Sequence, residues 1–362
     1  MNKKKDYLFS LVNSIKPVDK KKFYKIAEYR LNRLIKPKGS LGRLEEFAKD
    51  IVAITEEERP YLKNKFVCVF AGDHGVVEEG ISLFKQDVTA QMVINFLSGG
   101  AAINAIANSV NANVLVVDVG INANLKMPAA GNFINGKIKA GTNNIFKSKA
   151  MTYDDALESI LKGIEISNIV REKGADFCAT GDMGIGNTTP SSAITCFYSR
   201  KSPVFVCGRG TGVSSSIISK KASIIEKAIK SNIQNGGDPI DVLAGVGGFE
   251  IGAIAGFILG CAINRVPVVV DGFISTAGAL IAVNLNPDVL DYMFLGHLSK
   301  ERGHKTAVNL IKGKKPILDL SMRLGEGTGA VIAMNIIETA INMYNNMLTF
   351  DEANVFASKL NK

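Results

Sequence analysis

The segment RLGEGTGA, residues 323–330, places a single carboxylate, Glu326, among three glycines. Glycine lets the backbone approach a ligand closely, and a lone carboxylate beside such a turn can remove a proton from a bound molecule. The pattern also fits an ordinary helix start, because a carboxylate is stabilised near the positive end of the helix dipole. Taken alone, the segment favours the helix start, so the rest of the chain must decide whether Glu326 is a general base.

Two other glycine-rich segments have the pattern of a phosphate-binding turn. TGDMGIGNTTPSSAI, residues 180–194, follows a predicted strand and opens a predicted helix, and the backbone N–H groups of such a turn can hold an anion. CGRGTGV, residues 207–213, is a second tight loop, whose Arg209 could bind a phosphate or carboxylate in bidentate fashion. An ordinary capped turn is the alternative for the first segment, but several such loops in one chain favour a ligand site.

The segment AGVGGFEIGAIAG, residues 244–256, has a superficial likeness to a dinucleotide-binding fingerprint. It does not follow a convincing strand. No acidic residue ends a second strand about twenty residues later, as the contact to the ribose requires. The sequence therefore argues against a dehydrogenase.

The titratable residues form no recognisable metal or nucleophile motif. Asp73 and His74 follow a predicted strand, but the other histidines, His297 and His304, lie in a distant segment, so we expect a hydrogen-bonded turn rather than a metal site. The sequence lacks a GxSxG elbow, a P-loop, and the acidic pair with a threonine–glycine loop by which transferases of pyrophosphorylated ribose bind magnesium. This pattern favours metal-free chemistry on a phosphorylated small molecule.

Six short apolar runs supply the strands that must position these segments. Continuous apolar strands that alternate with helices indicate a parallel sheet covered on both faces. We therefore predict an α/β fold with an open, mostly parallel, Rossmann-like sheet, in which ligands bind beyond the carboxyl ends of the strands. The runs are FVCVFAGDHG from Phe66, NVLVVDVG from Asn113, ADFCATGDMG from Ala175, VPVVVDG from Val266, DYMFLGH from Asp291 and PILDL from Pro316.

The two ends of the chain differ in pattern from its middle. Residues 1–60 are charged and helical in pattern, with a turn in KPKGSLGRLEE from Lys36. The stretch from about Ala330 to Lys362 is also helical in pattern, so the two ends can meet. We predict a small helical domain of residues 1–60 together with about 335–362, beside a large α/β domain of residues 61–334.

The formal net charge of +9 comes mainly from lysine runs such as MNKKK at the start, DKKKFYK from Asp19 and KGKKP from Lys312. Such runs are usually solvated faces, and no aromatic-basic interleaving, zinc-finger spacing or recognition helix accompanies them. The sequence therefore argues against a nucleic-acid partner. A modest positive excess suits a protein that handles anionic small molecules.

The cysteines and apolar segments predict a cytoplasmic protein without a membrane span. The five cysteines are widely spaced and show no CxxC pair, so we expect reduced core residues and neither disulfides nor zinc. The lysine-rich start lacks an apolar signal core, which argues against export. GFEIGAIAGFILGCAINRVPVVVDG, residues 248–272, is broken by glycines, Arg265 and Pro267, and we expect a buried helix followed by a buried strand.

Eight segments, taken in order, resemble one known family. They are PKGSLGRLEE, AGDHGVVEEGIS, DVTAQMVINFLSGGAAIN, VVDVG, GDMGIGNTT, GRGTG, DGFISTAGAL and LDLSMRLGEGTGA. This set is similar to the nicotinate-nucleotide:dimethylbenzimidazole phosphoribosyltransferases of cobamide (vitamin B12) biosynthesis, over about residues 30–345. No single segment is specific to the family, but we do not expect eight such segments in the same order in an unrelated protein.

The resemblance implies an activity and a role for Glu326. The family moves phosphoribose from nicotinate mononucleotide to a benzimidazole nitrogen, with inversion at C1′. It implies neither metal nor cofactor, because the donor already carries a cationic pyridinium leaving group. In the family the glutamate of LGEGTGA removes the proton of the acceptor, and the matching residue here is Glu326. The resemblance also implies small-molecule substrates and a homodimer.

The resemblance further implies two groups of binding residues. The expected ligands of the nucleotide and its phosphate are Gly184, Gly186, Asn187, Thr188, Gly208, Arg209, Gly210, Gly212, Ser275, Gly278 and one lysine, Lys220 or Lys221. A flat heterocycle needs apolar walls and one or two orienting hydrogen bonds. The expected acceptor pocket is Ser82, Phe84, Gln91 and Leu324, with Gln86 as a substitute for Gln91.

Two departures from the family pattern affect the expected specificity. The usual family sequence at this turn is GEMGIGN, in which the glutamate is a second functional carboxylate. This chain has Asp182 instead. We expect aspartate to keep the negative charge but to reach less far. After GRGTG the family commonly has acidic residues, and this chain has Val213, Ser214 and Ser215. The alternatives are a phosphoribosyltransferase for another acceptor base and a non-catalytic azole- or nucleotide-binding protein. Which base is the acceptor stays open.

Overall fold

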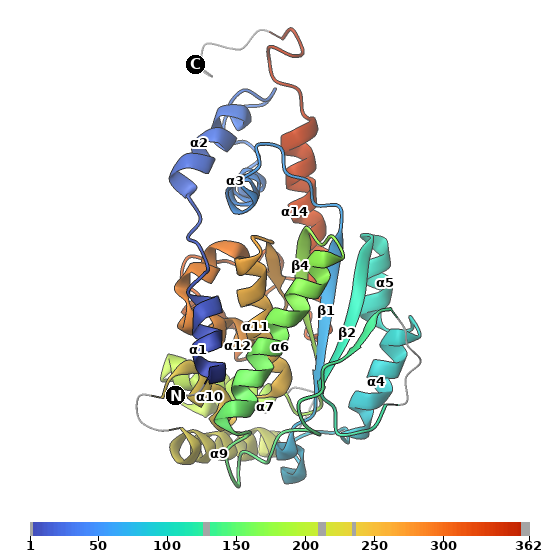
Figure 1. Ribbon diagram of the computed structural model, residues 1–362, viewed down its shortest axis with the longest axis vertical. Helices are drawn as coiled ribbons and strands as arrows, with labels where there is room; N and C mark the ends of the chain where they lie inside the picture. Colours follow the sequence, from blue (N-terminus) through green and yellow to red (C-terminus); the bar gives the residue numbers. More distant parts are fainter. Residues whose placement is uncertain (1–2, 126–130, 209–214, 234–236, 356–362) are drawn as a thin grey trace.

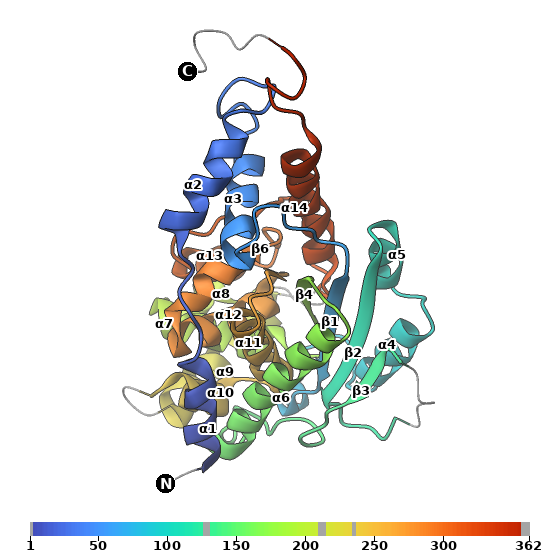
Figure 2. The ribbon, with the colours of Figure 1, turned by 45° about the horizontal axis from the view of Figure 1, so that its top comes forward.

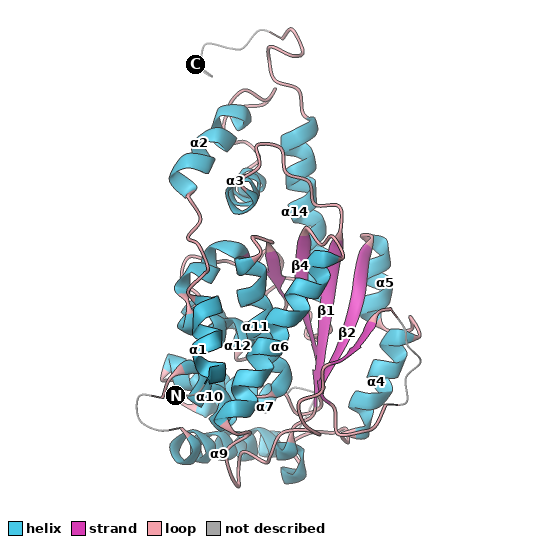
Figure 3. Ribbon diagram, in the orientation of Figure 1, coloured by secondary structure: helices cyan, strands magenta, loops and turns pink. Residues whose placement is uncertain are grey.

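The computed structural model describes residues 3–125, 131–208, 215–233 and 237–355. A six-stranded sheet in the order β3–β2–β1–β4–β5–β6 lies at its centre, and every adjacent pair of strands is parallel (Figure 3). The strands are β1 (Lys65–Gly72), β2 (Ala112–Gly120), β3 (Phe133–Asn135), β4 (Phe177–Met183), β5 (Val268–Val270) and β6 (Met293–Leu295). The predicted α/β fold with a parallel sheet is confirmed.

The central strand β1 shows why the apolar runs are continuous. It pairs with β2 on one side and β4 on the other, so Val67 lies between Val114 and Ala179. Helices cover both faces of the sheet, so side chains that point to either face are buried. The first five predicted runs correspond to β1, β2, β4, β5 and β6.

The sixth predicted run is not a strand. PILDL, from Pro316, forms a single parallel bridge between Leu318 and His297, just beyond the end of β6. Pro316 has no backbone N–H group, and β6 itself is only three residues long, so little ladder is available for pairing. The sheet instead gains the short edge strand β3, which is visible beside β2 in Figure 2.

Helices cover the sheet in two layers (Figure 1). On one face lie α11 and α12, with α6 packed against α11. On the other face lie α4, α5 and α14. The α-helices are α1 (Lys3–Val12), α2 (Lys20–Leu31), α3 (Arg43–Thr55), α4 (Asp87–Leu97), α5 (Ala102–Ser109), α6 (Tyr153–Glu172), α7 (Thr188–Ser199), α8 (Pro203–Val206), α9 (Ser215–Asn232), α10 (Pro239–Val246), α11 (Phe249–Ile263), α12 (Phe273–Leu285), α13 (His304–Leu310) and α14 (Thr328–Asn346), and the 3-10 helices are η1 (Gly75–Glu79) and η2 (Pro287–Tyr292).

The two ends of the chain meet in space. Helices α2 and α3 pack against each other, and α3 packs on α14 beyond the end of the sheet (Figure 1). Arg30 fastens this unit, because its guanidinium donates hydrogen bonds to the carbonyls of Tyr344, Asn345 and Met347 at the end of α14. Helix α1 lies apart from it, on α6 and α11. The boundaries of the small domain stay a prediction.

The apolar segments lie inside the fold. The segment expected to form a buried helix and strand forms α11 and β5, and almost all of it is buried. By length and composition one stretch of the described chain, residues 87–109, could cross a membrane. In the structure this stretch is two helices, α4 and α5, joined by a turn at residues 98–101.

Candidate active site

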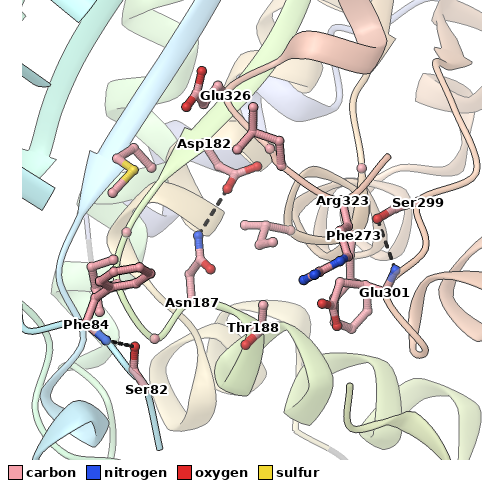
Figure 4. Close-up of a pocket in the computed structure, with 18 of the residues that line it drawn as sticks. Ser82, Phe84, Asp182, Asn187, Thr188, Phe273, Ser299, Glu301, Arg323 and Glu326 are labelled. Carbon is pink, nitrogen blue, oxygen red and sulfur yellow. Dashed lines mark hydrogen bonds between the residues drawn. The ribbon is translucent and has the colours of Figure 1, made fainter. Parts of the chain in front are cut away.

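A cavity of about 710 Å³ lies beyond the carboxyl ends of β4, β5 and β6. Its walls come from the segments 81–92, 182–188, 272–274, 297–301 and 323–326 and from Lys221. In Figure 4, Ser82 and Phe84 lie on one side and Ser299 and Glu301 on the other, with Asp182 and Glu326 above Asn187. The cavity therefore lies at the edge of the sheet where the parallel strand pattern predicts a ligand site.

Most of the predicted site residues in the described chain line this cavity. They are Glu326, Asp182, Gly184, Gly186, Asn187, Thr188, Ser82, Phe84 and Leu324. Of the two candidate lysines, Lys221 lines it, whereas Lys220 is exposed and donates a hydrogen bond to the carbonyl of Glu79. Arg209, Gly210 and Gly212 lie outside the described residues.

Five other candidates do not line the cavity. Gly208 lies behind its rim, where a β-carbon would come within 2.0 Å of Oε2 of Glu301. Ser275 and Gly278 are buried in α12, and Gly278 packs against Ile254. Gln91 points to solvent from α4, and Gln86 donates to the carbonyl of His74.

Glu326 sits in a strained loop. Gly325, Glu326 and Gly327 all have left-handed backbone conformations, with φ of +90°, +63° and +90°. The conformation is strained for glutamate and persists because the surroundings hold it, including a hydrogen bond from the Glu326 N–H to the carbonyl of Asp182 (3.2 Å). Such strain is common at functional sites, so it supports a working role for this loop.

The carboxylate of Glu326 does not cap its own helix. Helix α14 begins at Thr328, and the carboxylate near its first turn is Asp271, whose Oδ1 accepts a hydrogen bond from the Ala330 N–H (2.8 Å). Oε2 of Glu326 instead accepts a hydrogen bond from the Ile103 N–H at the start of α5 (3.2 Å). A helix does begin within RLGEGTGA, at Thr328, as the helix-start interpretation expects, but the Glu326 carboxylate is hydrogen-bonded at the start of α5 and lines the cavity.

Burial controls the protonation of Glu326. The side chain is only 5% exposed, and this burial raises the pKa of its carboxyl above the ordinary value of 4.5. The hydrogen bond from Ile103 lowers that pKa, and the nearby charge of Asp271 raises it further. A carboxylate with a raised pKa is a stronger base, so it accepts a proton from a weak N–H acid more readily.

Asp182 is the second-last residue of β4 and lines the same cavity. Its Oδ2 accepts a hydrogen bond from the Asn187 amide (3.0 Å), and its Oδ1 has no hydrogen-bond partner among the described residues. Burial, followed by the charges of Asp271 and Glu250, raises the pKa of Asp182 well above its usual range. The sequence predicts a retained charge at this position, but the burial favours a neutral acid that can donate a hydrogen bond from Oδ1.

Lys221 forms a basic corner of the cavity at the start of α7. Lys221 of α9 is buried, and its ammonium donates a hydrogen bond to Oγ1 of Thr188 (2.9 Å) at the first residue of α7. Burial lowers the pKa of Lys221, and Cys207 and Glu301 oppose that shift. A buried ammonium beside a helix N-terminus is a suitable place for a phosphate group.

Sequence reasoning missed several residues of the cavity wall. They are His297, Ser299 and Glu301 in GHLSKERGH, residues 296–304. The sequence pattern drew attention only to the histidines of this segment, and only as possible metal ligands. Burial, with the charge of His297, lowers the pKa of His304 to about 3, so His304 is neutral. Its Nδ1 accepts from the Ser299 N–H (2.7 Å) and its Nε2 faces Thr276 Oγ1 (2.9 Å), which holds the loop against α12.

The strand-end pair Asp73 and His74 supports a turn, as expected. Asp73 accepts hydrogen bonds from the Thr89 hydroxyl (2.7 Å) and the Asn122 N–H (2.8 Å). His74 Nε2 lies 2.7 Å from Oε1 of Glu250, and both side chains are buried. Within the described chain, no group of three or more His, Cys, Asp or Glu side chains could hold a metal ion.

Comparison with known proteins agrees with this geometry. A family model described as Phosphoribosyltransferase matches residues 15–355. The chain is 50% identical to a nicotinate-nucleotide–dimethylbenzimidazole phosphoribosyltransferase of Geotalea uraniireducens, over 94% of this chain and 96% of the relative. A protein of the same name from Geobacter metallireducens is also 50% identical, over 96% and 98% of the two chains.

A solved structure agrees as well. The crystal structure of CobT from Thermus thermophilus superposes with a TM-score of 0.89 at 41% identity, over 93% of this chain and 99% of that one. Sequence relatives, family model and fold thus match over nearly the whole length. The chain belongs to the family of nicotinate-nucleotide–dimethylbenzimidazole phosphoribosyltransferases.

Proposed function

We propose that this protein transfers phosphoribose from nicotinate mononucleotide to 5,6-dimethylbenzimidazole or a related base, giving α-ribazole 5′-phosphate and nicotinate for cobamide biosynthesis. The main support for this proposal is that one cavity has a buried carboxylate and a buried ammonium on different walls. A buried carboxylate with a raised pKa, Glu326, lies on one wall, and the buried ammonium of Lys221 beside the start of α7 lies on another. This arrangement suits a substrate pair with an acidic N–H group on one molecule and a phosphate on the other.

The chemistry needs one base and a fixed geometry. One ring nitrogen of the acceptor forms a bond to C1′ of the donor, while the bond from C1′ to the pyridinium nitrogen breaks. The electron pair of that bond neutralises the pyridinium ring, and nicotinate leaves. Glu326 takes the proton from the other ring nitrogen of the acceptor. Attack occurs on the face of C1′ opposite nicotinate, so the configuration inverts.

The two substrates fit different walls of the cavity. The donor phosphate fits the corner made by Lys221, Thr188 and the glycine turn before α7. The flat acceptor fits between apolar side chains near Glu326, since Phe84, Met92 and Leu324 line that part and Ser82 adds a hydroxyl. Asp182 lines the cavity as well, and burial raises the pKa of its carboxyl, which favours the protonated form that can donate a hydrogen bond.

The test is product formation by the purified protein and by Glu326→Gln. With nicotinate mononucleotide and 5,6-dimethylbenzimidazole, the wild type should release nicotinate and an α-riboside phosphate in equal amounts. Glu326→Gln should lower kcat by about 10²- to 10⁴-fold, the usual contribution of a general base, with an unchanged circular dichroism spectrum. Thermal stabilisation by both ligands without any product would instead indicate a binding protein.

The acceptor is tested by competition. Benzimidazoles, purines and phenols differ by a few atoms, and a pocket separates such ligands by only about 1–3 kcal/mol. We expect 5,6-dimethylbenzimidazole to give the main product when several bases compete for limiting enzyme. A purine or phenol product in excess would assign another acceptor to the same chemistry.

We also propose that the protein is a cytoplasmic homodimer. Three exposed apolar side chains, Leu83, Phe84 and Leu324, lie at or beside the cavity, and a second copy could cover them. All five cysteines are buried and free, which suits a reducing compartment. Light scattering coupled to size exclusion should give twice the mass of the chain, and the mass of one chain would contradict the dimer.

A further inference from the structure

The turn between α4 and α5 holds a buried amide that the substrate pockets do not explain. Asn104 is only 9% exposed and does not line the cavity. Its Oδ1 accepts a hydrogen bond from the Ala101 N–H (3.1 Å), and its Nδ2 donates to the carbonyl of Phe96 (2.9 Å). One side chain thus ties the last turn of α4 to the first turn of α5.

The first turn of α5 contacts Glu326. The N–H of Ile103 belongs to the helix-start donors that have no acceptor within their own helix, and it donates to Oε2 of Glu326 (3.2 Å). The positive end of the helix dipole also favours a negative charge at this place. The direction of this N–H follows the path of residues 98–101, the turn that Asn104 holds.

Helix α4, which Asn104 joins to α5, also forms the wall of the proposed acceptor pocket. Val88 and Met92 line the cavity. Between them in sequence, the Thr89 hydroxyl donates to Asp73 (2.7 Å) and accepts from the Ile185 N–H (3.1 Å) in the glycine turn. The start of α4 is therefore fixed to the nucleotide side, and its end is fixed through Asn104 to the helix that contacts Glu326.

The titratable groups around Glu326 make this contact important. Asp182 faces it from the end of β4, and Asp271 from the end of β5, with His297 Nε2 3.7 Å from Asp271. Arg323 of the same loop lines the cavity. Helix α5 has no charged side chain, so its contribution is the Ile103 N–H. Burial and Asp271 raise the pKa of Glu326, and this hydrogen bond lowers it.

We propose that Asn104 is a positioning residue for the transfer reaction, which holds the α4–α5 turn so that the Ile103 N–H keeps the Glu326 carboxylate ionised and in place beside the acceptor wall. This inference rests on the proposed role of Glu326 as the base. Asn104 itself touches neither substrate. Replacing Asn104 should therefore change the protonation and position of Glu326 and leave donor binding unchanged.

The test is the pH dependence of kcat/KM for Asn104→Ala. Weakening the Ile103 hydrogen bond should move the acid limb of the profile upward by about half to one pH unit, because the base then protonates at higher pH. The plateau value of kcat should fall about ten-fold through misplacement of the carboxylate. The KM for nicotinate mononucleotide should stay unchanged, since the basic corner keeps its contacts. Asn104→Asp, which retains an acceptor for the Ala101 N–H, should lie between Asn104→Ala and the wild type.

A matched control removes a similar cap elsewhere. Thr152 accepts a hydrogen bond from the Asp155 N–H (3.1 Å) at the start of α6, a helix that does not contact Glu326. Thr152→Ala should lower the thermal midpoint and leave the pH profile unchanged. A merely structural role for Asn104 would give the same result as this control.

The outcomes distinguish the role of Asn104 from the role of Glu326 as the base. An unmoved acid limb in folded Asn104→Ala, with activity that still depends on Glu326, overturns the inference about Asn104 alone. If Asn104→Ala does not fold, the same comparison is made with Asn104→Asp. Near-normal turnover by Glu326→Gln overturns the base assignment and the role of Asn104 together.

Discussion

The glycines of the loop 325–327 and those of helix α11 have different surroundings. In the loop, Gly325 and Gly327 adopt φ of +90°, which a residue with a side chain rarely adopts. In α11, Gly252, Gly256 and Gly260 recur every four residues on one face of the helix, and that face packs against α6. There the absent side chain matters for space, since a β-carbon on Gly256 would lie 1.8 Å from the carbonyl oxygen of Ile160.

This difference explains why two glycine-rich segments with similar sequences have different roles. Residues 244–256, with their likeness to a dinucleotide fingerprint, form the end of α10 and the first part of α11 and serve close helix packing. Residues 323–330 hold a buried acid in a strained loop at the cavity. Close packing raises stability, whereas strain and a buried carboxylate lower it. Stability measurements and activity measurements should therefore respond to different glycines.

The largest effect on stability is expected at the helix interface. Gly256→Ala should lower the free energy of unfolding by about 3 kcal/mol, because backbone atoms of α6 must move away from the new methyl group. Urea denaturation measures this loss. Gly260→Ala is a milder match, because its β-carbon would meet mainly the side chain of Ser167, 2.0 Å away at Oγ, and we expect a loss of about 1 kcal/mol. Equal losses would refute the close-backbone explanation.

A smaller effect, now on activity, is expected in the loop. Gly327→Ala should lower kcat about 100-fold, because a β-carbon at φ +90° would come within 2.6 Å of Val67 Cγ2 and displace Glu326. Gly313→Ala is the matched control, since Gly313 has φ of +76° with nothing within 4 Å. It should cost about 1 kcal/mol of stability and leave kcat unchanged. Similar kcat values for the two variants would show that the loop tolerates displacement.

The smallest effect concerns the buried acid itself. Because the folded-state pKa of Glu326 is raised above 4.5, its ionisation lowers stability as the pH rises from 4.5 through the folded-state pKa. Glu326→Gln lacks this loss, so at pH 7.5 it should be more stable than the wild type while it is nearly inactive. Unfolding at pH 4 and pH 7.5 measures the difference, and an advantage at pH 4 alone would contradict the assigned direction.

Local sequence pattern was sufficient for most of the architecture. The apolar runs predicted five strands of the sheet and its parallel arrangement, because side-chain periodicity and burial on both faces are local signals. The sixth run failed, since a single bridge at Leu318 depends on the end of a three-residue strand elsewhere. The candidate residues close to the predicted strand ends, such as Asp182 and Asn187, line the cavity for the same reason.

Choices between neighbouring residues could not be made from sequence. Lys220 and Lys221 are adjacent in one helix, and only the packing of α9 against α7 decides that Lys221 faces the cavity. Gln91 was a reasonable choice for the acceptor pocket, but α4 turns Val88 and Met92 inward and leaves Gln91 outside. The charge of Asp182 likewise depends on burial and on acids from distant segments, such as Asp271 and Glu250.

The sequence by itself determined the fold class, the family resemblance and the presence of an acid among glycines at position 326. Only the tertiary structure decided what this acid does in its surroundings. It brings Ile103 to Glu326 across 223 residues of chain, and it brings Asp271 to the start of α14 across 59. Helix and strand patterns repeat over a few residues, whereas hydrogen-bond partners and desolvation depend on segments that meet only after folding.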